Sequence, residues 1–209
     1  MANNQITKEA LATALKKLLE KQPLSKISVK HITDYCNISN TFYYHFQDKY
    51  ELINWVFYTD MLQNVNSFND PSKLTDSFLN VVKCLYANRK FYLACFQYVG
   101  QNSLYEYLND LYYEMWKINI DMRYSESGFK LTESELQLMA KMKAHSLVGI
   151  ISDWVKDGMR DNYMSYFEQV HAVLEFEASG YAHLTEERML GEHMEKANMI
   201  GRKKCLKVC

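Results

Sequence analysis

The sequence contains few residues that interrupt regular structure. Only two prolines and seven glycines occur among 209 residues, whereas 48% of the residues are hydrophobic. Proline and glycine destabilise helix interiors and are common in the turns of β-rich folds. A chain of this length and apolar content can bury a sizeable core. The composition therefore favours an all-α fold with long helices.

Strong net charge, a disulfide pattern and long apolar runs are also missing. The formal net charge is -1, so the chain as a whole is not a basic nucleic-acid binder. Its five cysteines are odd in number and scattered, which is typical of reduced thiols. The first residues, MANNQITKEA, lack an apolar signal core, and no run approaches the ~18 apolar residues of a membrane span. We therefore expect a cytoplasmic protein that does not enter a membrane.

No motif of an enzyme active site stands out. The sequence has no glycine-rich phosphate loop, nucleophile elbow or paired catalytic carboxylates. His183 with Glu186, and Glu192 with His193, lack the spacing of a zinc-binding helix. We expect no enzymatic activity, no metal site and no cofactor.

Positive charge gathers at the N-terminal end. Residues 1–50 contain seven lysines and four acidic residues, a net charge of +3, so the remainder carries -4. A basic end on an acidic body lets one surface meet phosphate. A chance cluster of surface lysines gives the same count, so charge alone leaves both interpretations open.

Three helices are expected in the same region. Residues 7–21 place apolar side chains at helical spacing, with Thr7 as a cap. Ser28 can cap a second helix that buries Ile32, and Asn37 suits the left-handed position after it. A third helix of about two turns follows in NTFYYHF. Two short helices joined by a tight turn predict a helix-turn-helix.

The third helix carries the side chains expected to meet DNA. Phe42 and Phe46 are four residues apart and share a face that can pack on the first two helices. Its other sides offer hydroxyl, amide and imidazole groups, which can reach phosphate oxygens or base edges. The alternative is an aromatic stripe inside a core, where aromatic residues usually pack. With the start of the second helix and a lysine after the third, the predicted DNA-binding residues are Ser28, Lys30, Asn40, Thr41, Tyr43, Tyr44, His45 and Lys49.

The segment TFYYHFQDKYEL resembles the recognition-helix signature of TetR-family transcriptional regulators. There, a Thr-apolar-Tyr-x-His/Tyr-Phe run precedes a lysine and a long connecting helix, and the match covers roughly Thr7 to Trp55. Downstream, SLVGIISDWVKDGM resembles the dimer-forming helix of such proteins. The NTFYYHF variant is more loosely similar to the subgroup near dihydroxyacetone kinase operons.

The resemblance implies a homodimer that binds palindromic double-stranded DNA. Tyr43 and Lys49 would contact phosphates, and Thr41, Tyr44 and His45 would lie at the groove. Between the second and third helices the sequence is one residue shorter than the family's common pattern, so the turn or the first recognition turn must be tighter.

The rest of the chain is expected to form a helical body. An N-terminal helix-turn-helix domain (1–50) would precede a regulatory and dimerisation domain (51–178) and a tail of uncertain structure (179–209). Aromatic residues are dense in the body, where they either line an effector pocket or form an ordinary core. The further helices are expected at roughly 73–88, 90–99, 102–125, 132–157 and 162–177.

One apolar seam in the body predicts a dimer contact. Its residues are Leu147, Val148, Ile151 and Val155, which recur at helical spacing beside Gly149. The same seam would also suit a helix buried inside its own chain. Both interpretations have the same periodicity.

Two functions fit these observations. The first is a homodimeric TetR-like regulator of operator DNA, controlled by a small-molecule or protein effector. The alternative is a helical protein-interaction adaptor that does not bind DNA, which the shortened turn favours. The two differ in whether the tyrosine-histidine side of the third helix faces outward.

Overall fold

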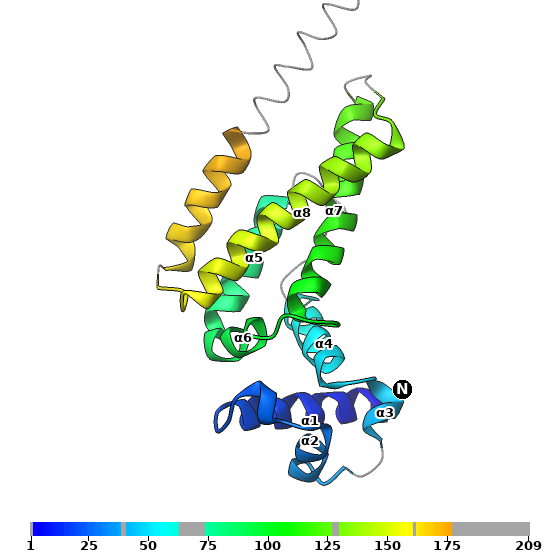
Figure 1. The fold of residues 1–209 in the computed structure, drawn as a ribbon, viewed down its shortest axis with the longest axis vertical. Coiled ribbons are helices and arrows are strands. Elements are labelled where there is room, and N and C mark those ends of the chain that lie inside the picture. The colour runs from blue at the N-terminus through cyan, green and yellow to red at the C-terminus, as the bar shows by residue number, and fades with distance from the viewer. Residues whose placement is uncertain (1, 39–40, 63–73, 127–129, 161, 177–209) are drawn as a thin grey trace, which may run out of the picture. The chain divides into compact units, whose positions relative to one another are not determined.

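The computed structural model describes residues 2–38, 41–62, 74–126, 130–160 and 162–176 (Figure 1). Within these ranges every regular element is helical and no strand occurs, which confirms the predicted all-α class. The chain packs as two units, Met1–Met164 and Ser165–Cys209. The first unit contains α1 (Ala2–Leu19), the 3-10 helix η1 (Leu24–Lys26), α2 (Val29–Tyr35), α3 (Phe42–His45), α4 (Lys49–Leu62), α5 (Leu74–Ala87), α6 (Arg89–Phe96), α7 (Leu104–Glu126) and α8 (Glu133–Lys156). Residues 163–176 form a further helix.

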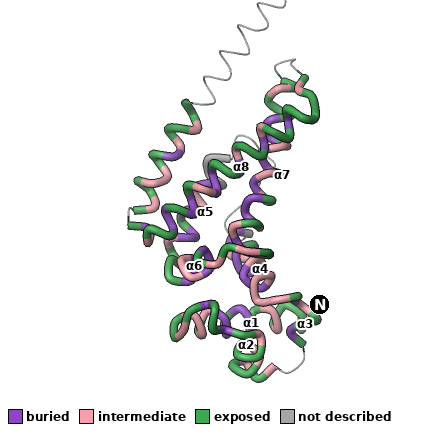
Figure 2. The backbone as a smooth tube through the Cα atoms, in the orientation of Figure 1, coloured by how far each residue is buried: buried purple, intermediate pink, exposed green. Residues whose placement is uncertain are grey.

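The three N-terminal helices surround a small apolar core, which we call the head. Leu11 and Leu15 of α1 and Ile32 of α2 are fully buried, and α1 packs along α2. Phe42, the first residue of α3, and Phe46, which follows its last residue, are almost completely buried. Figure 2 colours the backbone by burial and shows buried segments in the helices of the head as well as in those further along the chain. Burial of each such side chain stabilises the fold by roughly 1.5–3 kcal/mol. The core assignment made from spacing is therefore confirmed.

Helix α1 begins earlier than predicted. Thr7 lies inside the helix, which starts at Ala2, so its predicted role as a cap is wrong. The Gln5 side chain donates to Glu9 Oε1 over 2.9 Å, a pair four residues apart that supports the extra turn.

Local hydrogen bonds define both ends of α2 as the sequence indicates. The Ser28 hydroxyl accepts from the His31 backbone N–H, and His31 Nδ1 accepts from the Ser28 N–H, which makes a capping box. At the other end Asn37 has a positive φ of 52°. The Ile38 N–H then donates to the Thr33 carbonyl, the bond that closes a Schellman motif.

The body consists of α5 to α8. Helices α7 and α8 pack against each other along their lengths, and Thr132 with Glu135 forms the predicted capping box at the start of α8. Residues 177–209, which include the predicted tail and the weak His and Glu pairs at 183–193, lie outside the described residues.

The seam on α8 corrects the dimer prediction. Leu147, Val148, Ile151 and Val155 are 3% exposed or less within a single chain. Helix α8 turns this face toward its own chain, where α7 and α6 pack against it. The seam residues are therefore core residues and are not available to a second copy. Spacing alone could not separate the two cases, because an internal and an intermolecular helix contact need the same apolar periodicity.

Candidate nucleic-acid interface

Two phenylalanines anchor a single helical turn, α3, to the head. Helix α3 has four residues and is shorter than the two turns predicted. The Phe42 and Phe46 rings lie 5.8 Å apart, and Phe46 also packs against Trp55 of α4 at 5.9 Å. So short a helix has little stability of its own, because helix nucleation is unfavourable. Its position therefore depends on these anchors and on the residues that follow it.

The side of α3 away from the anchors faces outward. Tyr43 and Tyr44 are 71% and 78% exposed, Thr41 is exposed and His45 is half-buried. The side chains of Tyr43 and Tyr44 are therefore accessible to an external partner. Asn40 and the preceding Ser39 lie outside the described residues. This outward orientation meets the geometric requirement of the DNA-reading hypothesis, which would fail if these side chains were sealed in the core.

A lysine from α1 lies beside α3, and sequence reasoning missed it. The Lys8 ammonium is 5.4 Å from the centre of the Phe46 ring and 5.8 Å from that of Trp55. Burial, followed by the charge of Lys8, lowers the pKa of His45 below its usual value. Lys8 lies within the helix predicted at residues 7–21, but its position beside Phe46 and His45 was not predicted.

Two of the predicted DNA contacts belong to α2. Ser28 and Lys30 are both exposed, and the Ser28 hydroxyl accepts the His31 N–H over 3.2 Å. Ser28 therefore has a structural role as a helix cap, whatever else it contacts. Its contact with DNA, and that of Lys30, stay predictions.

Lys49 is bonded within the protein. Its ammonium donates to the carbonyl oxygens of Leu24 and Ile27, both over 2.7 Å. Burial lowers the pKa of Lys49, and the neighbouring Asp48 partly offsets this. An ammonium has three N–H donors, so these carbonyls take two of them. Lys49 ties the start of α4 to the segment before α2, and its predicted phosphate contact stays a prediction.

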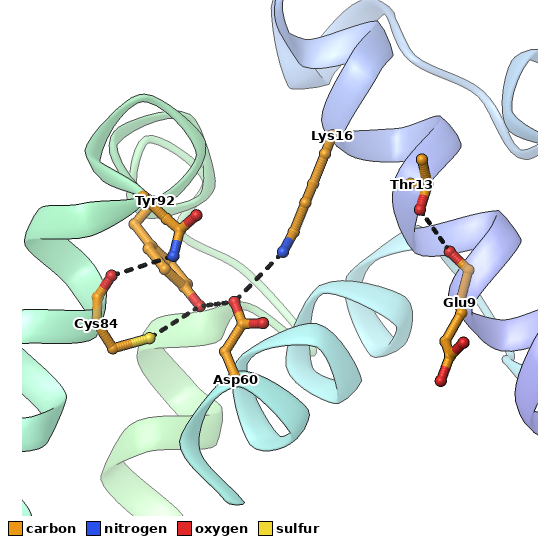
Figure 3. Close-up of polar contacts among 7 residues, drawn as sticks. Glu9, Thr13, Lys16, Asp60, Cys84 and Tyr92 are labelled. Atoms are coloured by element: carbon orange, nitrogen blue, oxygen red, sulfur yellow. Dashed lines mark hydrogen bonds and ion pairs between the residues drawn. The ribbon is translucent and has the colours of Figure 1, made fainter. Parts of the chain in front are cut away.

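A polar chain joins the head to the body (Figure 3). Lys16 of α1 lies 3.4 Å from Asp60 Oδ2 of α4, and the Tyr92 hydroxyl of α6 donates to the same oxygen over 2.9 Å. Cys84 Sγ of α5 is 3.7 Å from that hydroxyl. Burial raises the pKa of Cys84 to about 11. Four helices therefore meet at one linked set of polar groups, and the thiol stays protonated near neutral pH.

Other kinds of site find little support in the part of the chain that the structure describes. No group of three or more His, Cys, Asp or Glu side chains is placed to hold a metal ion there. Among the same residues, no helix combines the length and apolar character needed to cross a bilayer.

Comparison with known proteins points to gene regulation. The family model described as the C-terminal region of transcriptional regulators, of the TetR group, matches residues 72–176. The HTH-type dhaKLM operon transcriptional activator DhaS of Lactococcus lactis subsp. lactis (strain IL1403) is 31% identical over 97 residues. That alignment covers 46% of this chain and 52% of the relative, so the chain matches about half of the relative's length.

A solved structure has a similar fold. The dihydroxyacetone kinase operon activator DhaS superimposes with a TM-score of 0.60 and 21% sequence identity. The superposition covers 82% of this chain and 96% of that one. At this identity the likeness concerns the fold, which extends over both the head and the body.

Proposed function

Because the chain belongs to the TetR family of transcriptional regulators, we propose that it binds palindromic operator DNA as a homodimer in the cytoplasm. A small-molecule or protein effector would control this binding. Its head would read the DNA, and its body would carry the dimer contact and the effector site.

The exposure of Tyr43 and Tyr44 on an anchored turn is the observation that carries the proposal. More than two thirds of each side chain is accessible, although large aromatic residues are usually mostly buried. A tyrosine can donate and accept hydrogen bonds and can pack on a sugar or a base methyl group. An outward pair on a short turn is suited to a DNA groove.

The charge of the head supports the same partner. Lys8 lies near His45, and Lys30 is exposed on α2. Lysines near phosphate release counterions on binding, which provides most of the sequence-independent affinity of DNA-binding proteins. The head therefore offers tyrosines for the groove and nearby cations for the phosphate backbone.

We place the homodimer contact on the outer face of α8. Leu138 and Met142 are 60% and 62% exposed, and Gly149 lies on the same face by helical spacing. A Cβ added at Gly149 would meet nothing within 4 Å, so the helix surface is open there. Exposed apolar residues on the same helix face as a glycine suit close approach of a second helix. Two copies related by twofold symmetry would present two heads to a palindrome.

The names of the relatives support a target. The curated relative is described as an activator of the dhaKLM operon, and the solved structure as a dihydroxyacetone kinase operon activator. We propose that this chain also controls a dihydroxyacetone kinase operon. The effector would act through the body on α4, which follows α3 directly and contacts α1, α5 and α7.

In vitro selection tests the proposal and identifies the operator in the same experiment. The full-length protein is used to enrich duplexes from a random library, and affinity for the enriched duplex is measured by fluorescence anisotropy over a series of salt concentrations. We expect enrichment of an inverted repeat and a steep loss of affinity with salt. Failure to enrich any duplex, with no salt-dependent affinity, would instead favour the adaptor.

A further inference from the structure

The loop between α6 and α7 contacts the first turn of α4. The Asn102 side-chain amide donates to Asp48 Oδ2 over 3.0 Å, and Asn54 Nδ2 of α4 donates to the Asn102 carbonyl over 3.1 Å. Asn102 has a φ of 62°, a left-handed conformation that asparagine tolerates better than most residues. A residue of the body is therefore joined to α4 by both its side chain and its backbone.

Asp48 divides its two oxygens between the loop and the helix. Oδ1 accepts from the backbone N–H groups of Tyr50 and Glu51, over 2.7 and 2.8 Å, and so caps α4. Oδ2 accepts from Asn102. One carboxylate thus fixes the start of α4 and connects it to the body.

A second contact lies beside the first. The Tyr50 ring of α4 stacks on the Tyr98 ring of the loop, with centroids 3.9 Å apart and planes within 9° of parallel. Tyr98 folds closely over Gly100, where a Cβ would come within 2.7 Å of the Tyr98 hydroxyl oxygen. Any larger residue at position 100 would displace Tyr98, so the stack depends on the shape of the loop.

Lys49 lies between Asp48 and Tyr50 in the sequence and contacts the head. Its ammonium holds the carbonyls of Leu24 and Ile27, which directly precede α2. Of three consecutive residues, Asp48 and Tyr50 therefore contact the body and Lys49 contacts the head. Helix α3 ends only three residues earlier, at His45.

We propose that Asn102 is a positioning residue for the DNA-facing turn: by holding Asp48, it fixes the start of α4 and thereby the orientation of α3. The inference rests on the proposed function, because it concerns the turn assigned to DNA. Its physical basis is the shortness of α3, which cannot hold its own position. One anchor of α3 is Phe46, which lies two residues before Asp48. Greater mobility of Asp48 would therefore also loosen α3.

Two single variants break the contact in different ways. Asn102→Gly removes the amide but suits the left-handed backbone. Asp48→Asn keeps an oxygen to cap α4 while placing an amide donor opposite the Asn102 donor. Gln101→Gly is the matched control, because it adds the same flexibility to the same loop next to Asn102. The double variant Asp48→Asn/Asn102→Asp reverses donor and acceptor and should restore the bond.

Hydrogen–deuterium exchange of the full-length protein reads the effect on the head. We expect amides of residues 42–52 to exchange about 3- to 10-fold faster in each single variant, which is the range for loss of one hydrogen bond. Residues 11–19 of α1 should exchange as in the wild type, and so should residues 42–52 in the control and in the reversed pair. Equal exchange in the single variants and the wild type, or failure of the reversed pair to restore protection, would overturn the inference.

Affinity for the selected duplex provides the functional readout. We expect the dissociation constant to rise about 3- to 10-fold in both single variants, with an unchanged salt dependence, because a positioning residue contacts no phosphate itself. A shallower salt dependence would mean direct phosphate contact and would contradict a positioning role. If the wild type enriches no duplex, the proposed function fails, and the exchange results alone decide whether Asn102 orders the turn.

Discussion

The buried hydroxyl of Tyr92 donates a hydrogen bond to Asp60 Oδ2 over 2.9 Å and so joins α6 of the body to α4. The Lys16 ammonium of α1 lies 3.4 Å from the same oxygen and 5.5 Å from the centre of the Phe91 ring. Burial raises the pKa of Tyr92 well above its usual value, so it remains a donor at any physiological pH. The head is thus fastened to the body near both ends of α4, at Asp60 and at Asp48.

Removal of the Tyr92 hydroxyl should destabilise the protein. We expect Tyr92→Phe to lower the free energy of unfolding by about 1.5–3 kcal/mol, because the bond is made to a charged acceptor. Urea denaturation followed by circular dichroism measures the change. Tyr58→Phe is the control, since Tyr58 is 46% exposed and its variant should stay within about 0.5 kcal/mol of the wild type. Equal stability of the two variants would show that the Tyr92 bond contributes nothing.

Substitution of a buried anchor of α3 should mainly lower stability, whereas substitution of an exposed tyrosine should mainly lower DNA affinity. Phe42→Ala should lower the free energy of unfolding by about 3–5 kcal/mol, because the side chain is almost fully buried. Tyr44→Ala should change stability by less than about 0.5 kcal/mol, because the side chain is exposed. It should nevertheless weaken binding to the selected duplex. Strong destabilisation by Tyr44→Ala would show that the residue packs and would weaken its assignment to DNA.

The affinity for DNA should depend on the protonation of His45. Burial and Lys8 hold the pKa of His45 below its usual value in the free protein, so the imidazole is neutral at pH 7.5. A nearby phosphate favours the imidazolium form and raises this pKa, so binding takes up a proton. Affinity should therefore increase as the pH falls from 7.5 to 5.5, by less than about tenfold per pH unit for one site. His45→Gln should remove this component, and an identical pH profile in that variant would contradict the assignment.

Protonation of His45 should have the opposite effect on folding stability: it should lower the free energy of unfolding. Neutral His45 is favoured in the folded head, so its contribution to stability is present above the unfolded pKa and is lost as the pH falls through the lowered folded pKa. Protonation of His45 therefore cannot raise DNA affinity by stabilising the head. Unfolding curves at pH 7.5 and 5.5, compared with those of His45→Gln, separate the two effects.

The two faces of α8 should respond differently to charge. Leu138→Glu combined with Met142→Glu should convert the proposed dimer to a monomer in multi-angle light scattering and leave the fold intact, because both side chains are exposed in one chain. Ile151→Glu should instead unfold the protein, since it places a charge in a fully buried position. A dimer that survives the double substitution would place the contact elsewhere.

Local signals in the sequence predicted local features well. The Ser28 and Thr132 caps, the left-handed Asn37 and the inward Phe42 and Phe46 all depend on residues within a few positions of one another. Hydrogen bonds and helical periodicity at such short range are set mainly by the chain itself. The fold of the head and the outward orientation of its tyrosines could be predicted from the sequence for this reason.

Features that depend on contacts between residues far apart in the sequence could not be predicted from it. The seam on α8 looked the same whether its partner was α7 or a second copy, and only the packing decided it. The sequence predicted that Lys49 would contact a phosphate, because the Leu24 and Ile27 carbonyls that accept its hydrogen bonds lie 25 and 22 residues away in the chain. The bond from Asn102 to Asp48 joins two polar residues far apart in the sequence, so no periodic pattern could reveal it.

The outward face of α3 is most directly tested by one comparison of affinities. Binding of the Tyr43→Ala/Tyr44→Ala double variant to the selected duplex is measured by fluorescence anisotropy beside the wild type and Tyr58→Ala, all confirmed as folded. The double variant should bind at least about tenfold more weakly, since a good base contact contributes about 1–3 kcal/mol, and Tyr58→Ala should match the wild type. Wild-type affinity in the double variant would contradict DNA reading by α3.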